Sequence, residues 1–162
     1  MKTSSPRLSR EHAREVLAKV EAITSSRTGR GARDNVVRLL NEAVPTYNWV
    51  GIYVVQGGDL VLDAWSGPLA TEHTRIPIGK GVCGFAAKAG RSEIVSDVGK
   101  DSRYLECFPS TRSEMVVPIF NGEKVVGEID IDSDQLDAFS SLDSEFLEAV
   151  ARKLGTLGFQ FP

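Results

Sequence analysis

The hydrophobic positions near the N-terminus recur every three or four residues, as they do along one face of a helix. This spacing predicts a helix over residues 9–25 with Ser9 as its cap. A second helix is predicted after a break at Gly29 and Gly31, and it ends at Pro45. The two apolar stripes consist of Ala13, Val16, Leu17, Val20 and Ile23, and of Val36, Val37, Leu40 and Val44.

The middle of the chain has a different pattern, with apolar runs rich in β-branched and aromatic residues. These runs predict strands. Four of them pair as two hairpins, Trp49–Val55 with Leu60–Trp65 and Met115–Phe120 with Lys124–Asp132. The first hairpin turns at Gly57-Gly58 and the second at Asn121-Gly122, both of which are common two-residue turns.

Shorter elements complete the pattern. A short helix is predicted over Val82–Ala89, a small strand over Glu93–Val95 and a final helix over about Ser141–Leu157. The stripe of the final helix consists of Phe139, Leu142, Phe146, Ala149, Val150 and Leu154. Helices that flank a series of hairpins indicate the α+β class, with an antiparallel sheet against which the helices pack.

Composition narrows the class of protein. The chain has 162 residues, 41% of them hydrophobic and 25% charged, which suits one globular domain. No apolar run is long enough to span a bilayer, and the N-terminus lacks the apolar core of a signal peptide, so we expect a cytoplasmic protein without a membrane partner. The net charge is −3, and the basic residues 1–33 are too dilute and too poor in aromatics to predict nucleic-acid binding.

The stretch GKGVCG, Gly79–Gly84, fits the G-x-G-x-x-G pattern of a dinucleotide site. Such a site needs a buried strand before the glycines and a full helix after them. Here the preceding strand is short and broken by Pro77, and the following helix ends at Gly90. We therefore reject a nucleotide site, which leaves the glycines as a tight turn around Cys83.

The segment Asp97–Arg112 has no periodicity, and a loop of this length is usually a lid or a binding loop. It carries Cys107, the second of two cysteines. A single cysteine is most often a small buried hydrophobe, but in a reducing compartment a pair beside turns is more often catalytic. Arg103 and Arg112 would favour a Cys107 thiolate, and Glu106 would oppose it.

Alternation in GEIDID places Glu128, Asp130 and Asp132 on one face of a strand. An isolated strand with this pattern would turn these carboxylates to solvent. On an interior strand they would repel one another, an arrangement that makes sense if an ammonium group lies among them. The two cysteines and two histidines lack zinc-site spacing, so we predict no metal site.

Four stretches in order, NWVGIYVV, RIPIGKGVCGFAA, C-x₆-E-MVVPI and GEIDIDS, resemble the GAF-domain free methionine-(R)-sulfoxide reductases over roughly residues 35–155. The resemblance implies a single GAF-like domain over 1–162, with an N-terminal helical extension over 1–33 and a core over 34–158. It also implies that the N- and C-terminal helices pack on one face of the sheet. Loops and short helices would cover a ligand site on the other face.

The same resemblance implies residue roles. Cys107 falls at the nucleophile, Glu114 at the carboxylate that assists the sulfoxide oxygen and Cys83 at a resolving cysteine. Asp130 and Asp132 fall at the residues that hold the substrate amino group, and Glu128, on the same face of the strand, is predicted to bind the substrate with them. Trp49 and Tyr53 match aromatics around the methyl-sulfur end. One position departs from the pattern, because His73 stands where many members have a third cysteine.

For function, the resemblance implies thiol-dependent reduction of free L-methionine-(R)-sulfoxide, with a sulfenic acid and an intramolecular disulfide as intermediates. It implies thioredoxin as the reductant, no metal or organic cofactor, and a homodimer. Two alternatives stay open at this point. One is a non-catalytic GAF sensor that binds an amino acid-like ligand, and the other is an interaction module whose N-terminal helices only dimerise.

Overall fold

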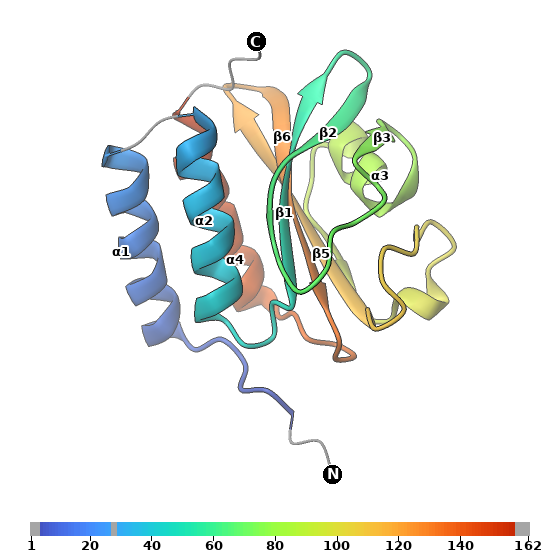
Figure 1. The fold of residues 1–162 in the computed structure, drawn as a ribbon, viewed down its shortest axis with the longest axis horizontal. Helices are drawn as coiled ribbons and strands as arrows, with labels where there is room; N and C mark the ends of the chain where they lie inside the picture. The colour runs from blue at the N-terminus through green and yellow to red at the C-terminus, as the bar shows by residue number, and fades with distance from the viewer. Residues whose placement is uncertain (1–3, 27–28, 158–162) are drawn as a thin grey trace.

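The computed structural model describes residues 4–26 and 29–157. In chain order the elements are α1 (Arg10–Ser26), α2 (Gly29–Ala43), β1 (Trp49–Gln56), β2 (Asp59–Ser66), β3 (Arg75–Pro77), α3 (Gly81–Ala89), β4 (Glu93–Val95), η1 (Val98–Lys100), β5 (Ser113–Asn121), β6 (Lys124–Ser133) and α4 (Ser141–Gly155). The strands form one antiparallel sheet in the order β3-β2-β1-β6-β5-β4. Helices α1, α2 and α4 cover one face of it, whereas α3 and the loop over residues 97–112 lie on the other (Figure 1). The predicted α+β architecture is confirmed.

Most predicted elements are confirmed, and their ends differ by about two residues. Ser9 caps α1, since its hydroxyl accepts the backbone N–H of His12 at 3.1 Å. The predicted break between the helices is confirmed at Gly29, the first residue of α2, whose φ of 62° is one that glycine adopts easily, but it is wrong at Gly31, which lies inside α2. Residues 27–28, between α1 and α2, lie outside the described residues.

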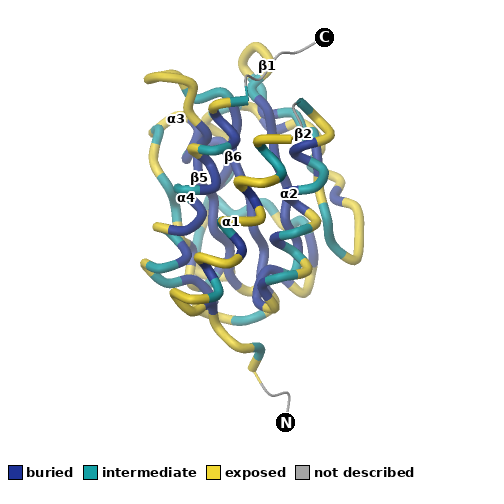
Figure 2. The backbone as a smooth tube through the Cα atoms, turned by 90° about the vertical axis from the view of Figure 1, so that its left-hand side faces the viewer, coloured by how far each residue is buried: buried dark blue, intermediate teal, exposed yellow. Residues whose placement is uncertain are grey.

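The larger apolar core lies between the three helices and the sheet. Behind α1, α2 and α4 the strands are mostly buried, while the outer turns of α1 are exposed (Figure 2). Val20 of α1 and Leu40 of α2 are fully buried, as are Ile129 and Ile131 of β6. Because side chains alternate along a strand, the residues between these isoleucines must point to the opposite face of the sheet.

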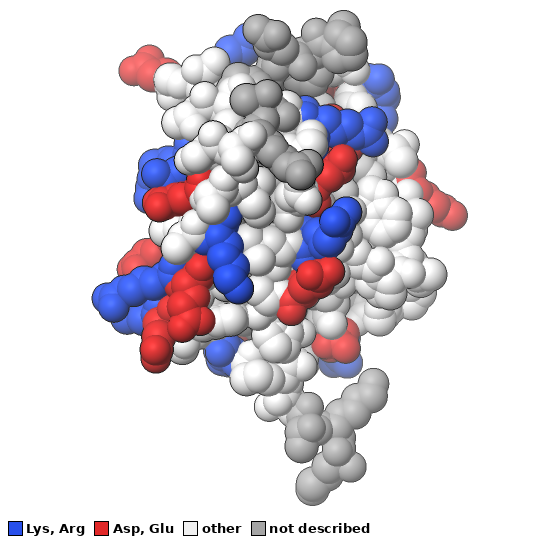
Figure 3. Space-filling view, turned by 60° about the vertical axis from the view of Figure 1, so that its left-hand side comes forward, with Lys and Arg blue, Asp and Glu red and all other residues white. Residues whose placement is uncertain are grey.

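Charged residues of both signs are mixed on the helical face (Figure 3). Two ion pairs join α1 to α4, Arg10 with Glu145 at 3.7 Å and Lys153 with Glu21 at 3.3 Å. The basic residues of the N-terminal part are therefore partly paired with acidic ones on this face. Among the described residues, no helix is long and apolar enough to cross a bilayer.

Candidate functional site

The register of three neighbouring strands sets the site. On β6, Asp132 lies opposite Trp49 of β1 and opposite Glu114 of β5. Four residues earlier, Glu128 lies opposite Tyr53. These side chains therefore share the face of the sheet away from the helical core, and the predicted alternation of GEIDID is confirmed.

The carboxyl groups of this face are buried, so they do not form a solvent-exposed edge. Glu128 is 0% exposed, Asp130 1%, Asp132 2% and Glu114 4%. Both oxygens of Glu128, both of Asp132 and Oδ1 of Asp130 have no hydrogen-bond partner among the described residues. An unpaired buried carboxylate is costly, so a cation or shared protons must offset the charge.

Burial is the main cause that raises the pKa of each of these carboxyls. It raises the pKa of Glu128 and Asp132 well above their ordinary values, and the charge of Asp130 adds to the effect. The pKa of Glu114 is also raised, by burial and then by the charges of Asp130 and Asp132. For Asp130 burial raises the pKa, while hydrogen bonding with Glu114 and Cys83 opposes that rise. Of these two neighbouring carboxyls, Glu114 therefore holds a proton more tightly than Asp130 does.

Cys83 lies in the first turn of α3, on a tightly packed glycine turn. A Cβ on Gly84 would lie 2.7 Å from the Pro77 carbonyl oxygen, so only glycine fits there. The Cys83 thiol is buried and donates toward Glu114 Oε1 at 3.8 Å. Burial raises its pKa, and the charges of nearby carboxyls raise it further. The sheet is antiparallel here and β3 spans only Arg75–Pro77, so the βαβ unit that a dinucleotide turn needs does not surround Gly79–Gly84.

Cys107 is half-buried in the long loop, where its Sγ lies 3.6 Å from the Leu105 carbonyl oxygen. Burial raises its pKa, and the charges of Asp130 and Asp132 add to this rise. The sequence left open whether Arg103 and Arg112 or Glu106 would dominate at this thiol, and among the described residues burial and the charges of Asp130 and Asp132 do so instead. The guanidinium of Arg103 is bonded to Asp101 instead, with Nη2 2.7 Å from Oδ2.

One cavity brings the predicted reactive residues together. Its lining consists of His73, Ile76, Val82, Cys83, Leu105, Cys107, Glu114 and Asp130, and its volume is about 10 Å³. A neighbouring cavity of about 40 Å³ is lined by Trp49, Phe108 and Asp132, among others. The first has room for about one water molecule, so an amino acid can enter only after the covering loop shifts.

Aromatic side chains pack over one end of the acidic face, which is the face of the sheet that carries Glu114, Glu128, Asp130 and Asp132. Trp49 lies against Trp65, with ring centroids 6.4 Å apart, and against Phe108, at 5.8 Å. The Tyr53 hydroxyl donates to the His73 carbonyl oxygen at 2.7 Å. A Cβ on Gly51 would collide with the Trp49 ring, so this glycine lets the indole lie across β1.

The sequence did not predict the contacts that three residues make at the site, namely Gly51, Phe108 and His73. Gly51 could have been suspected as a glycine inside a strand, and Phe108 as an apolar residue in a polar loop. His73, predicted only as a departure from the family pattern, contacts the loop directly. Its Nε2 lies 3.0 Å from the carbonyl oxygen of Glu106, one residue before Cys107.

The donor set around the cavity is one that favours cations. Ligand atoms of Cys83, Glu114 and Asp130 lie within 4.8 Å of one another, close enough to hold a metal ion. The absence of a metal site was predicted from the spacing of cysteines and histidines along the chain. That spacing does not reveal the cluster of Cys83, Glu114 and Asp130. The same carboxyl oxygens suit an organic ammonium group, and the absence of a resident metal stays a prediction.

Comparison with known proteins gives a consistent result. The family model described as "GAF domain" matches residues 32–156. The curated free methionine-R-sulfoxide reductase of Escherichia coli is 32% identical over 120 residues, which cover 74% of this chain and 72% of that protein. Two solved structures also match nearly the whole chain.

The first is free methionine-R-sulfoxide reductase from Neisseria meningitidis in complex with its substrate. It is 35% identical with a TM-score of 0.85, and the match covers 96% of this chain and 95% of that one. The second is the reduced form of the fRMsr of Staphylococcus aureus. It is 32% identical with a TM-score of 0.86, and the match covers 97% and 99%.

Proposed function

Because the chain belongs to the GAF-domain free methionine-R-sulfoxide reductase family, we propose that it reduces free L-methionine-(R)-sulfoxide to methionine. The observation that carries the proposal is the common cavity of Cys83, Cys107, Glu114 and Asp130. Two thiols, a protonated acid and an unpaired carboxyl are the groups that this reduction needs. A sensor that only binds an amino acid would not require both cysteines at this cavity.

The substrate's ammonium group is assigned to the acidic face. Asp130 and Asp132, with Glu128, are buried without hydrogen-bond partners for most of their oxygens, and an ammonium group would satisfy them. A peptide-linked methionine has no such group, which explains selectivity for the free amino acid. Trp49 and Tyr53 border the same face and would enclose the apolar methyl-sulfur end.

In the first step, Glu114 donates its proton to the sulfoxide oxygen while the Cys107 sulfur attacks the substrate sulfur. The oxygen is transferred to Cys107, methionine leaves, and the thiol proton of Cys107 returns to Glu114. The thiol is oxidised to a sulfenic acid, and the sulfoxide is reduced to a thioether. In the empty site the charges of Asp130 and Asp132 raise the pKa of Cys107. A bound ammonium group would cancel these charges and favour the thiolate.

In the second step, the Cys83 thiol attacks the sulfenic acid of Cys107. A disulfide and one water molecule form. An external dithiol, which we assign to thioredoxin, then reduces the disulfide and restores both thiols. The proposal includes a cytoplasmic homodimer, uses no metal or organic cofactor, and makes Cys83 the sole resolving residue, since His73 stands in place of a third cysteine.

The test is an assay in which NADPH oxidation is coupled through thioredoxin reductase and thioredoxin. We expect turnover with free L-methionine-(R)-sulfoxide and little with the (S) epimer. N-acetylation removes the positive charge that the acidic face would bind, so the N-acetylated substrate should also be poor. Equal turnover of free and N-acetylated forms would contradict the proposed role of Asp130 and Asp132.

A further inference from the structure

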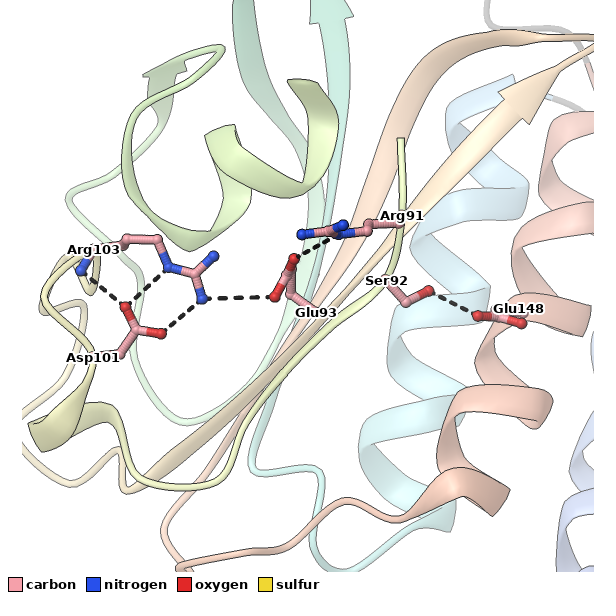
Figure 4. Close-up of polar contacts among 6 residues, drawn as sticks. All are labelled: Arg91, Ser92, Glu93, Asp101, Arg103 and Glu148. Carbon is pink, nitrogen blue, oxygen red and sulfur yellow. Dashed lines mark hydrogen bonds and ion pairs between the residues drawn. The ribbon is translucent and has the colours of Figure 1, made fainter. Parts of the chain in front are cut away.

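The loop that carries Cys107 is stiffened at Arg103 by a side chain that folds back on its own turn (Figure 4). The Asp101 carboxylate accepts three hydrogen bonds from Arg103, from the backbone N–H at 2.9 Å, from Nε at 3.0 Å and from Nη2 at 2.7 Å. A two-nitrogen contact of this kind fixes the direction of the guanidinium plane. The pKa of Asp101 is lowered by its hydrogen bonds to Arg103.

The same guanidinium crosses from the loop to two other elements. Its Nη2 lies 3.6 Å from Glu93 of β4, and its central carbon lies 4.6 Å from the centre of the Phe85 ring. Phe85 is on α3, two residues after Cys83. Arg103 thus joins the loop of one cysteine to the helix of the other through a cation–π contact, and to β4 through an ion pair.

Between Arg103 and Cys107 the loop follows the first turn of α3. A Cβ on Gly81 would lie 2.8 Å from Leu105 Cδ1, so the leucine occupies the space that the glycine leaves open. The carbonyl oxygen of Leu105 is in turn 3.6 Å from Cys107 Sγ. The contact between Arg103 and α3 therefore also sets the position of the Cys107 thiol, through the short stretch of backbone that joins the two residues.

We propose that Arg103 is a positioning residue that holds the Cys107 loop against α3, so that oxidised Cys107 meets Cys83. This inference rests on the proposed function. The step that it serves is attack of the Cys83 thiol on the Cys107 sulfenic acid, in which a sulfur–sulfur bond forms, a sulfur–oxygen bond breaks and water leaves. Within the described residues, the side-chain contacts of Arg103 are with Asp101, Glu93 and Phe85, which lie outside the cavity lining, so Arg103 acts through loop position.

Arg91 offers a matched control within the same cluster (Figure 4). Its guanidinium carbon lies 5.5 Å from the Phe85 ring centre, and its Nε lies 3.3 Å from Glu93. It shares two partners with Arg103, but it stands on the turn between α3 and β4, off the cysteine loop. Loss of Arg91 removes the same types of contact without releasing that loop.

The experiment compares reduced wild type with the variants Arg103→Met, Arg103→Lys and Arg91→Met. Each is mixed with one equivalent of methionine sulfoxide, and methionine and the Cys83–Cys107 disulfide are counted by rapid quench and mass spectrometry. In Arg103→Met we expect methionine release within about threefold of wild type and disulfide formation slower by roughly 10- to 100-fold, the effect of a misplaced reacting group. Arg103→Lys keeps the positive charge but loses the two-nitrogen contact. Its rate of disulfide formation should therefore lie between those of wild type and Arg103→Met. Arg91→Met should match wild type.

A second arm replaces the sulfoxide by hydrogen peroxide, which also converts a thiol to a sulfenic acid. If wild type releases no methionine but the peroxide-driven disulfide slows in Arg103→Met, the proposed function fails and the positioning role stands. The positioning role is overturned if Arg103→Met forms the disulfide at the wild-type rate in both arms, if Arg91→Met slows it equally, or if wild type forms none. Should Arg103→Met fail to fold, Asp101→Asn removes the carboxylate charge that fixes the direction of the Arg103 guanidinium, and it is held to the same outcomes.

Discussion

Replacing Glu128 by glutamine should change how the stability of the reduced, substrate-free protein depends on pH. The folded Glu128 carboxyl keeps its proton at pH values where the unfolded chain, with an ordinary pKa of 4.5, has lost it. The folded state then binds more protons than the unfolded state, so the free energy of unfolding falls as pH rises from about 4.5 toward the raised pKa. For this one carboxyl the slope is at most about 1.4 kcal/mol per pH unit.

Glutamine does not titrate, so Glu128→Gln should remove that share of the slope. We expect the two proteins to differ little near pH 5 and the variant to gain stability relative to wild type at pH 8. The assay is urea unfolding of both proteins at half-unit intervals from pH 5 to 8, with a phosphine reductant and without substrate. The group that Glu128 can bond is the nearby Cys83 thiol, and the amide oxygen of glutamine can accept from that thiol as well.

Glu123→Gln is the matched control, because Glu123 is exposed at the turn between β5 and β6. It makes the same replacement of a carboxyl by an amide without changing the buried acidic face. If Glu128→Gln and wild type show the same pH slope, the Glu128 carboxyl titrates normally and the desolvation argument fails. A wild type whose stability rises from pH 5 to 8, parallel to the variant, would refute the reasoning in the same way.

Three further predictions follow from the site. Glu114→Gln removes the proton donor and should lower turnover by roughly 10²- to 10⁴-fold with much less change in substrate affinity, as steady-state kinetics and calorimetric titration will measure; wild-type turnover would remove Glu114 from the mechanism. Cys107→Ser should release no methionine even in a single turnover, whereas Cys83→Ser should release about one per subunit and stall when thioredoxin is the reductant; a full burst from Cys107→Ser would exchange their roles. Gly51→Ala places a methyl group against the Trp49 ring and should lower the free energy of unfolding by about 1–3 kcal/mol and raise KM, and thermal unfolding with kinetics will test both.

Features that depend on neighbouring residues in the chain could be predicted from the sequence. The helical stripe of α1, the two hairpins and the alternation of GEIDID each reflect a local period, and local geometry fixes which side chains share a face. The alternation also restricted the acidic face to two environments, solvent or interior. It did not decide between them, since the burial of β6 depends on α3 and on the loop that carries Cys107.

What the tertiary structure decided is the chemical state of the site. The sequence placed two arginines and Glu106 near Cys107 and left the direction of its pKa shift open. In the folded chain burial and the charges of Asp130 and Asp132 raise that pKa, and Arg103 is bonded to Asp101. Proximity along the chain is a poor guide here, because a buried charge acts through space on whatever segments pack around it. The order of residues alone thus determined the elements, the strand faces and the family, whereas the pKa values, the closed cavity and the attachment of the loop to α3 arose only when distant segments excluded water together.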